Sequence, residues 1–134
     1  MTMPLRVLML EDQPECAEMV AAKLRQAGFA PDWTRVQNET EFLAHLDDPG
    51  LDLILADYNL PHFDALRALS RVQERNLNIP FIVITGFFEE EALECLKRGA
   101  TDYLLKDRLG RLQQAVTHAL ETRRLQEEKR QIEL

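Results

Sequence analysis

Four short, continuous apolar runs are the feature that most constrains how this chain can fold. They occupy residues 7–10, 53–56, 81–84 and 103–105. None of them alternates polar with apolar residues, as a strand with one face in water would. Continuous apolar strands are typical of a parallel sheet that helices cover on both faces. A weaker run at residues 32–36 does alternate, and we expect it to form an edge strand.

Helical patterns occupy the gaps between these runs. Gly28 can end the first helix in a left-handed cap, and Asn38 with Glu41 resembles a capping box at the start of the second. Acidic residues at 89–91 crowd the start of a later helix, where the helix dipole favours carboxylates. Asp107 is expected to cap the last helix. Strand and helix alternate five times, which predicts an α/β fold with a parallel sheet and right-handed crossovers.

The size and charge of the chain limit its function. Its 134 residues suit one domain, and its net charge of -7 argues against a nucleic-acid-binding surface. No apolar run approaches the roughly 20 residues of a membrane span, and the amino terminus lacks the pattern of a signal peptide. Cys16 and Cys95 both fall in predicted helices and are expected to be free thiols. A cytoplasmic location follows, with neither nucleic acid nor membrane as a partner.

Three carboxylates directly follow two of the predicted strands. Glu11 and Asp12 come after residues 7–10, and Asp57 comes after residues 53–56. Sites in parallel sheets form at the carboxyl ends of strands, so these acids meet in one cleft if the first and third strands are neighbours. Carboxylates in one cleft repel each other unless a cation joins them, and Mg²⁺ prefers such oxygen ligands. The alternative is that each acid merely caps the helix after its strand.

Two further polar residues end predicted strands. Thr85 follows residues 81–84, and Lys106 follows residues 103–105. A hydroxyl and an ammonium group that converge on a carboxylate and a cation make a site for phosphoryl transfer. Taken singly, Thr85 fits an ordinary β-branched strand residue better than a catalytic one, and Lys106 fits a solvated loop lysine better. Their common placement at strand ends is what favours the phosphoryl site.

Four segments in order resemble one known family, the receiver domain of bacterial two-component response regulators. The resemblance covers roughly residues 5–120 and is carried by the segments LMLED at 8–12, LILADYNLP at 53–61, IVITG at 82–86 and GATDYLLK at 99–106. It implies a flavodoxin-like fold in three layers, with a five-stranded parallel sheet in the order 2-1-3-4-5.

The same resemblance implies roles for individual residues. Asp57 would accept the phosphoryl group, and Lys106 would pair first with Asp57 and then with that group. Asp12 would bind Mg²⁺ directly and Glu11 through water, and the backbone carbonyl of Asn59 would be a further ligand.

Three further roles concern the switch and its surroundings. Thr85 would move toward the phosphoryl group, Tyr103 would swing inward, and the small Gly86 would leave room. Asp107 stands where most members of the family have proline after the lysine, which leaves the geometry of that peptide bond open.

These roles together predict a phosphorelay receiver and not an enzyme in the usual sense, because the domain would catalyse only its own phosphorylation and dephosphorylation. A histidine kinase or a histidine phosphotransfer protein would donate the phosphoryl group. One alternative is a Mg²⁺-dependent phosphohydrolase with an aspartyl nucleophile, but that chemistry wants a second acid where Asn59 stands. Another is a flavin-binding module, in which Glu11 and Asp12 would repel the cofactor's phosphate.

The carboxyl-terminal segment differs from the rest of the sequence. Residues 121–132 are good helix formers and mostly polar, and Leu125 and Ile132 are seven residues apart. We expect the last helix to continue past Leu120, with the receiver at 1–122 and a helical extension or connector at 123–134. Such an extension would serve a homodimer or a downstream module, or would be a solvated helix end.

Overall fold

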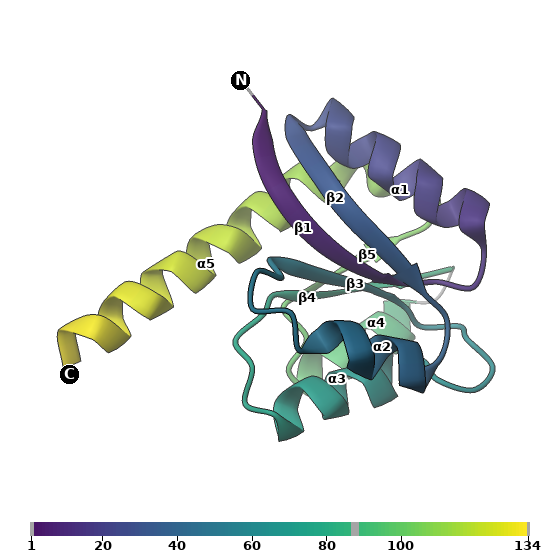
Figure 1. Ribbon diagram of the computed structural model, residues 1–134. Coiled ribbons are helices and arrows are strands. Elements are labelled where there is room, and N and C mark those ends of the chain that lie inside the picture. Colours follow the sequence, from purple (N-terminus) through teal and green to yellow (C-terminus); the bar gives the residue numbers. More distant parts are fainter. Residues whose placement is uncertain (1, 87–88, 134) are drawn as a thin grey trace.

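Five parallel strands form the central sheet of the computed structural model, in the order β2-β1-β3-β4-β5 (Figure 1). The structure describes residues 2–86 and 89–133. The strands are β1 Met3–Leu10, β2 Phe29–Val36, β3 Leu53–Asp57, β4 Phe81–Thr85 and β5 Asp102–Leu105. The helices are α1 Pro14–Gln26, α2 Glu39–Leu46, α3 Ala65–Glu74, α4 Glu89–Lys97 and α5 Leu112–Glu133, with a 3-10 turn at Leu109–Arg111. The predicted fold class and strand order are confirmed.

Helices cover both faces of the sheet, which explains why the strands do not alternate in polarity. In β1, Val7 and Met9 enter the core under α1 and α5, whereas Leu8 and Leu10 enter the core under α2, α3 and α4. The buried residues of β3 and β4 divide between the two cores in the same way. Figure 1 shows α1 and α5 on one side of the sheet and α2, α3 and α4 on the other.

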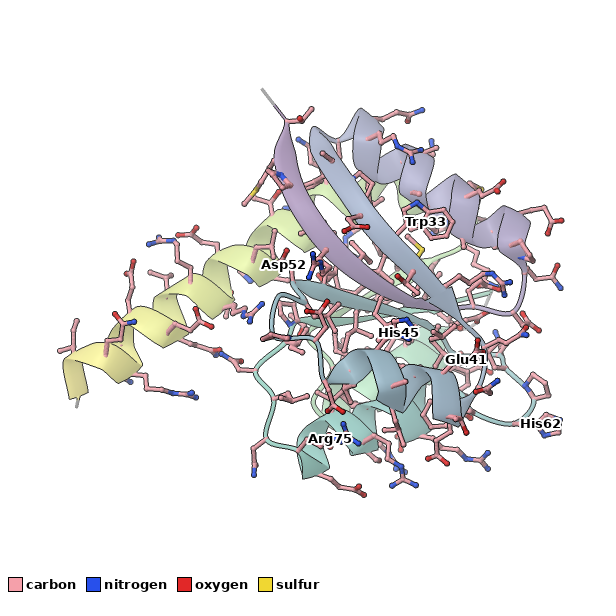
Figure 2. All side chains as sticks on the ribbon, in the orientation of Figure 1. Trp33, Glu41, His45, Asp52, His62 and Arg75 are labelled. Atoms are coloured by element: carbon pink, nitrogen blue, oxygen red, sulfur yellow. The ribbon has the colours of Figure 1, made fainter. Side chains whose placement is uncertain are left out.

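The edge strand β2 shows the alternation that the sequence predicts. Its residues change between exposed and partly buried along most of its length. Trp33 is partly buried and packs against the core under α1 (Figure 2). The strand begins at Phe29, three residues before the predicted run, because it pairs with β1 along all of Met3–Leu10.

Most helix ends follow the predicted signals. Gly28 has a positive φ of 98° just after α1, and the Asn38 side chain accepts a hydrogen bond from the Glu41 N–H at the start of α2. The prediction for Asp107 was wrong. A 3-10 turn with Arg108 at its start precedes α5, and no side chain caps that turn. The Arg108 N–H instead donates to the Leu105 carbonyl, which turns the chain before α5 begins.

Helix α5 is unbroken over 22 residues, and its last turns project away from the sheet (Figure 1). This confirms that the helix continues past Leu120. Arg123 donates a hydrogen bond of 3.2 Å to the Leu51 carbonyl, just before β3. Farther along, Leu125 and Ile132 are 51% and 83% exposed, so the part of the chain that the structure describes covers neither of them.

Three smaller expectations can be compared with the described residues. Cys16 and Cys95 are both free, as predicted. Across residues 2–86 and 89–133, no helix has the length and apolar character needed to cross a bilayer. The described peptide bonds are all trans, and they include the bond between Lys106 and Asp107.

Candidate functional site

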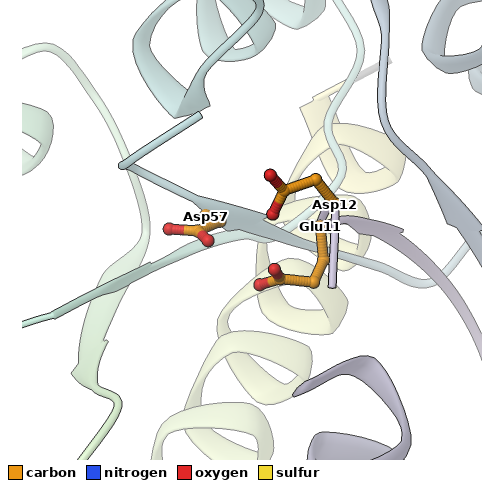
Figure 3. Close-up of side chains that lie close together, drawn as sticks. All are labelled: Glu11, Asp12 and Asp57. Carbon is orange, nitrogen blue, oxygen red and sulfur yellow. The ribbon is translucent and has the colours of Figure 1, made fainter. Parts of the chain in front are cut away.

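The candidate site lies where the strand order reverses, between β1 and β3. Leu10 of β1 pairs with Ala56 of β3, so the residues that follow them come together at the carboxyl edge of the sheet. Carboxylate oxygens of Glu11, Asp12 and Asp57 all lie within 4.8 Å of one another (Figure 3). The structure therefore brings together the three acids that the sequence placed at these strand ends.

The three acids differ in burial, and burial controls the charge of one of them. Glu11 is 7% exposed and Asp57 is 4% exposed, whereas Asp12 is open to solvent. Burial, followed by the negative charge of Asp57, raises the pKa of Glu11 to about 7. The Gln13 N–H opposes this effect by donating a hydrogen bond of 3.0 Å to Glu11. Near neutral pH, Glu11 is therefore divided between its protonated and ionised forms.

Lys106 brings positive charge into the acidic site. Its Nζ lies 2.8 Å from Asp57 Oδ2 and 3.7 Å from Glu11 Oε2. Burial works to lower the pKa of Lys106, but the hydrogen bond to Asp57 and the charges of Asp57 and Glu11 raise it above its ordinary value. Lys106 therefore stays protonated at neutral pH and neutralises part of the acidic charge.

Backbone hydrogen bonds hold Asp57 and Lys106 in these positions. The Asn59 N–H donates to Asp57 Oδ1 at 2.9 Å, so both carboxylate oxygens of Asp57 have a partner. The Lys106 N–H donates to the Thr85 carbonyl at 2.8 Å, which joins the loop after β5 to the end of β4. Backbone groups at the carboxyl ends of the strands thus fix the positions of Asp57 and Lys106.

Thr85 lies at the same edge, but its hydroxyl is directed elsewhere. The side chain is fully buried, and its Oγ1 donates to Glu91 Oε2 of α4 at 3.1 Å. The acidic cluster at the start of α4 suggested only a favourable dipole interaction, so the role of Glu91 was missed. A carboxylate in the first turn of the helix after a strand-end hydroxyl is the one signal that could have found it.

The other two predicted residues flank the site. Tyr103 is half-buried on β5, and the guanidinium carbon of Arg111 lies 5.6 Å from the centre of its ring. A Cβ at Gly86 would stand 3.6 Å from Asn59 Nδ2, an ordinary contact, so the site has room for a small side chain there.

The donor atoms at this edge suit a hard divalent cation. Three carboxylates supply oxygen ligands at close range, and Lys106 alone does not balance their charge. Oxygen-rich sites that keep an open, solvated side are typical of Mg²⁺ in proteins that handle phosphate. Asp12 provides that solvated side.

Comparison with known proteins identifies similar sequences over most of the chain. The family model for the response regulator receiver domain matches residues 7–117. The transcriptional regulatory protein BaeR of Escherichia coli is 35% identical over 102 residues, which cover 75% of this chain and 41% of BaeR. The chain therefore spans less than half the length of that relative.

Solved structures show the same similarity in three dimensions. The crystal structure of NtrX from Brucella abortus in complex with ADP matches with a TM-score of 0.85 and 26% identity, covering 98% of this chain and 30% of NtrX. A response regulator receiver domain protein from Clostridium thermocellum matches with a TM-score of 0.78 and 20% identity. The match covers 90% of this chain and 98% of that protein, and at this identity it shows a shared fold.

Proposed function

Because the chain belongs to the response regulator receiver domain family of two-component signalling, we propose that it works as a phosphorylation switch with Asp57 as the acceptor. The observation that carries this proposal is the setting of Asp57. Its carboxylate is buried at the end of β3, with one oxygen bound by Lys106 and the other by the Asn59 N–H. Such a carboxylate is held in one orientation and is not free to turn away from an incoming phosphoryl group.

The reaction we propose is a transfer from a phosphohistidine. An oxygen of the Asp57 carboxylate forms a new bond to phosphorus while the bond between phosphorus and the histidine nitrogen breaks. The bonding electron pair stays on the imidazole, which leaves as a neutral ring because its other nitrogen carries a proton, and Asp57 attacks as its carboxylate, so no proton has to leave it. Lys106 then offsets charge on the phosphoryl oxygens, at the position where it now contacts Asp57.

A divalent cation, Mg²⁺ by the chemistry of the donors, would be held by the acidic residues at the same edge. Asp12 and Asp57 are the proposed direct ligands, with Glu11 acting through water and the Asn59 carbonyl as a further ligand. When bound, the cation would neutralise charge that builds on the transferred oxygens. The close approach of the three carboxylates supports this proposal.

The acyl phosphate would shift the domain between two conformations. We propose that Thr85 turns toward the phosphoryl group and that Tyr103 moves with it, which changes the surface formed by α4 and β5. A histidine kinase or a histidine phosphotransfer protein in the cytoplasm would be the donor. The two free thiols suit a reducing compartment.

The test is stoichiometric labelling of the intact protein. Incubation with phosphoramidate and Mg²⁺ should add one phosphoryl group by mass spectrometry, and Asp57→Asn should abolish it. Asp107→Asn is a matched control, because this exposed acid directly follows Lys106. If Asp57→Asn is labelled as well as the parent protein, the acceptor is a different residue.

A phosphohydrolase predicts a different outcome in the same experiment. It would turn over a small phosphoester many times, whereas a receiver would be labelled once and lose its phosphoryl group slowly. The position of the second acid in such an enzyme holds Asn59, whose backbone N–H contacts Asp57. Sustained release of phosphate from p-nitrophenyl phosphate, lost in Asp57→Asn, would favour the hydrolase.

We further propose that the extension beginning at residue 123 connects the receiver to a second copy or to another module. Arg123 is the first residue of that extension, and its side chain donates a hydrogen bond to the Leu51 carbonyl. A cut after Arg123 therefore leaves this contact in place. The shortened chain should be labelled normally and should self-associate less. Sedimentation that finds both chains equally monomeric, with and without beryllofluoride, would exclude the homodimer.

A further inference from the structure

The hydrogen bond between Thr85 and Glu91 has only one possible direction. A carboxylate oxygen accepts hydrogen bonds, so the Thr85 hydroxyl donates its proton to Glu91 Oε2 across 3.1 Å. A hydroxyl carries one proton, and here that proton is already used. The Thr85 side chain is fully buried, so no water molecule can replace Glu91 as the acceptor without a change of structure.

Phosphorylated Asp57 would compete for the same proton. A phosphoryl group on an aspartate offers acceptor oxygens and no donor, and Glu91 likewise offers acceptors only. Thr85 therefore cannot serve both groups, and binding to one requires release of the other. We propose that Glu91 is a latch that holds Thr85 in the unphosphorylated conformation and opposes phosphorylation of Asp57. This inference rests on the phosphorylation switch proposed above and names a residue that regulates it.

The position of Glu91 supports this role over a purely helical one. Tyr58, the residue after Asp57, has a pKa that is raised by burial first and by the charge of Glu91 second, so the carboxylate acts close to the acceptor strand. The Thr85 carbonyl is fixed by the Lys106 N–H, so the residue can respond mainly through its side chain. Release of Glu91 would free the first turn of α4, so a change at the buried Thr85 would alter the surface that α4 presents.

The neighbouring residue Glu90 provides a matched control. It lies in the same first turn of α4, has the same charge and is exposed. Glu90→Ala and Glu91→Ala therefore remove the same favourable interaction with the helix dipole. Only Glu91→Ala also releases the Thr85 hydroxyl.

The first measurement is the affinity for beryllofluoride, a mimic of the phosphoryl group, in the presence of Mg²⁺. Glu91→Ala should bind it about 10-fold more tightly than the parent, the effect of losing one charge-assisted hydrogen bond in the competing state. Glu91→Gln keeps an acceptor oxygen without the charge and should fall between the two. Glu90→Ala should match the parent. A residue that merely supports the fold would lower the affinity when removed.

The second measurement is a double-mutant cycle with Thr85→Val, which removes the hydroxyl and keeps the branched shape. In that background Glu91→Ala should have no further effect on beryllofluoride affinity, because the latch has already lost its donor. Thr85→Ser should restore the effect. An undiminished gain from Glu91→Ala in the Thr85→Val protein would overturn the proposal, as would equal affinities for Glu91→Ala and Glu90→Ala.

A third measurement separates failure of the latch from failure of the proposed function. Hydrogen exchange of the amides at residues 93–96, which donate to the carbonyls of the first turn of α4, needs no phosphorylation. Glu91→Ala and Thr85→Val should each raise this exchange above that of Glu90→Ala, and the two together should not add. If the parent protein does not bind beryllofluoride, the phosphorylation switch fails. Exchange that is unchanged in both variants means that the latch fails, whatever the parent protein binds.

Discussion

The ion pairs at the carboxyl edge of the sheet and those along the end of α5 have similar lengths but different surroundings. Lys106 Nζ lies 2.8 Å from an Asp57 side chain that is 4% exposed. Arg124 lies 2.5 Å from Glu121 and 2.5 Å from Glu128, and about half of each of these three side chains is exposed. Distance alone would make the pairs on α5 the stronger ones.

Surroundings reverse that ranking. Water and dissolved salt screen the pairs on α5, and holding long side chains in one geometry has an entropic cost, so such pairs contribute little. At the sheet edge the charges are desolvated, so removal of one partner leaves the other buried without compensation. The site therefore depends on a few charged side chains, each of which needs its partner, whereas the end of α5 tolerates changes.

The largest difference between the two regions is expected when their positively charged side chains, Lys106 and Arg124, are replaced. Lys106→Met should slow labelling of Asp57 on the order of 100-fold, because a preorganised charge at the transferred oxygens is lost. Arg124→Met should leave the labelling rate unchanged. Rates from mass spectrometry with phosphoramidate check both. Equal rates for Lys106→Met and the parent would show that Lys106 only neutralises the resting site.

The acids of the two regions should respond to pH with opposite signs. The pKa of Glu11 in the folded protein is about 7, against an ordinary value of 4.5, so the fold binds this proton more tightly than the unfolded chain does. The stabilisation that this proton provides is full below pH 4.5 and is lost as pH rises through 7. Glu11→Gln should therefore raise the free energy of unfolding by about 1–3 kcal/mol at pH 8 and have little effect at pH 4.

Glu121 supplies the contrasting case. Its hydrogen bond with Arg124, followed by the charge of Arg124, lowers its pKa below the ordinary value. Its contribution is present above that ordinary value and is lost as pH falls, so Glu121→Gln should weaken the protein slightly at pH 8 in buffer of low ionic strength. Urea unfolding at pH 4, 6 and 8 measures both variants. A gain for Glu11→Gln that is the same at every pH would exclude the electrostatic explanation.

An intermediate effect is expected at Arg123, where α5 leaves the body of the domain. Its hydrogen bond to the Leu51 carbonyl is partly buried, so Arg123→Met should cost about 1 kcal/mol. Hydrogen exchange should increase for the amides near Leu51 and around Arg123. Arg130→Met, on the exposed part of the same helix, is the control and should change neither quantity.

The smallest effect is expected for the exposed pairs themselves. Arg124→Gln removes contacts with both Glu121 and Glu128, yet its melting temperature should match that of the parent at physiological salt. Any difference should appear only at low ionic strength, where screening is weak. A clear loss of stability that persists in high salt would mean that Arg124 stabilises the protein through more than these exposed ion pairs.

The sequence predicts the acidic edge well because its residues adjoin strands with an unmistakable pattern. Continuous apolar runs define β1 and β3, and the strand order that the family resemblance implies makes these strands neighbours, which places Glu11, Asp12 and Asp57 together. The partner of Thr85 does not follow, because it depends on how the chain enters α4. Sequence pattern also failed at Asp107, where a backbone turn replaces the expected side-chain cap.

Helix α5 runs without interruption from the core, past Arg123, to its exposed end. A continuous helix fixes both the direction and the distance of any group attached to its end. Each residue added after Arg123 would turn everything beyond it by about 100° and advance it by about 1.5 Å. Insertion of one residue would therefore point an attached group in a new direction, whereas insertion of seven would nearly restore its original bearing. The activity of a module carried on this helix should thus rise and fall periodically with linker length.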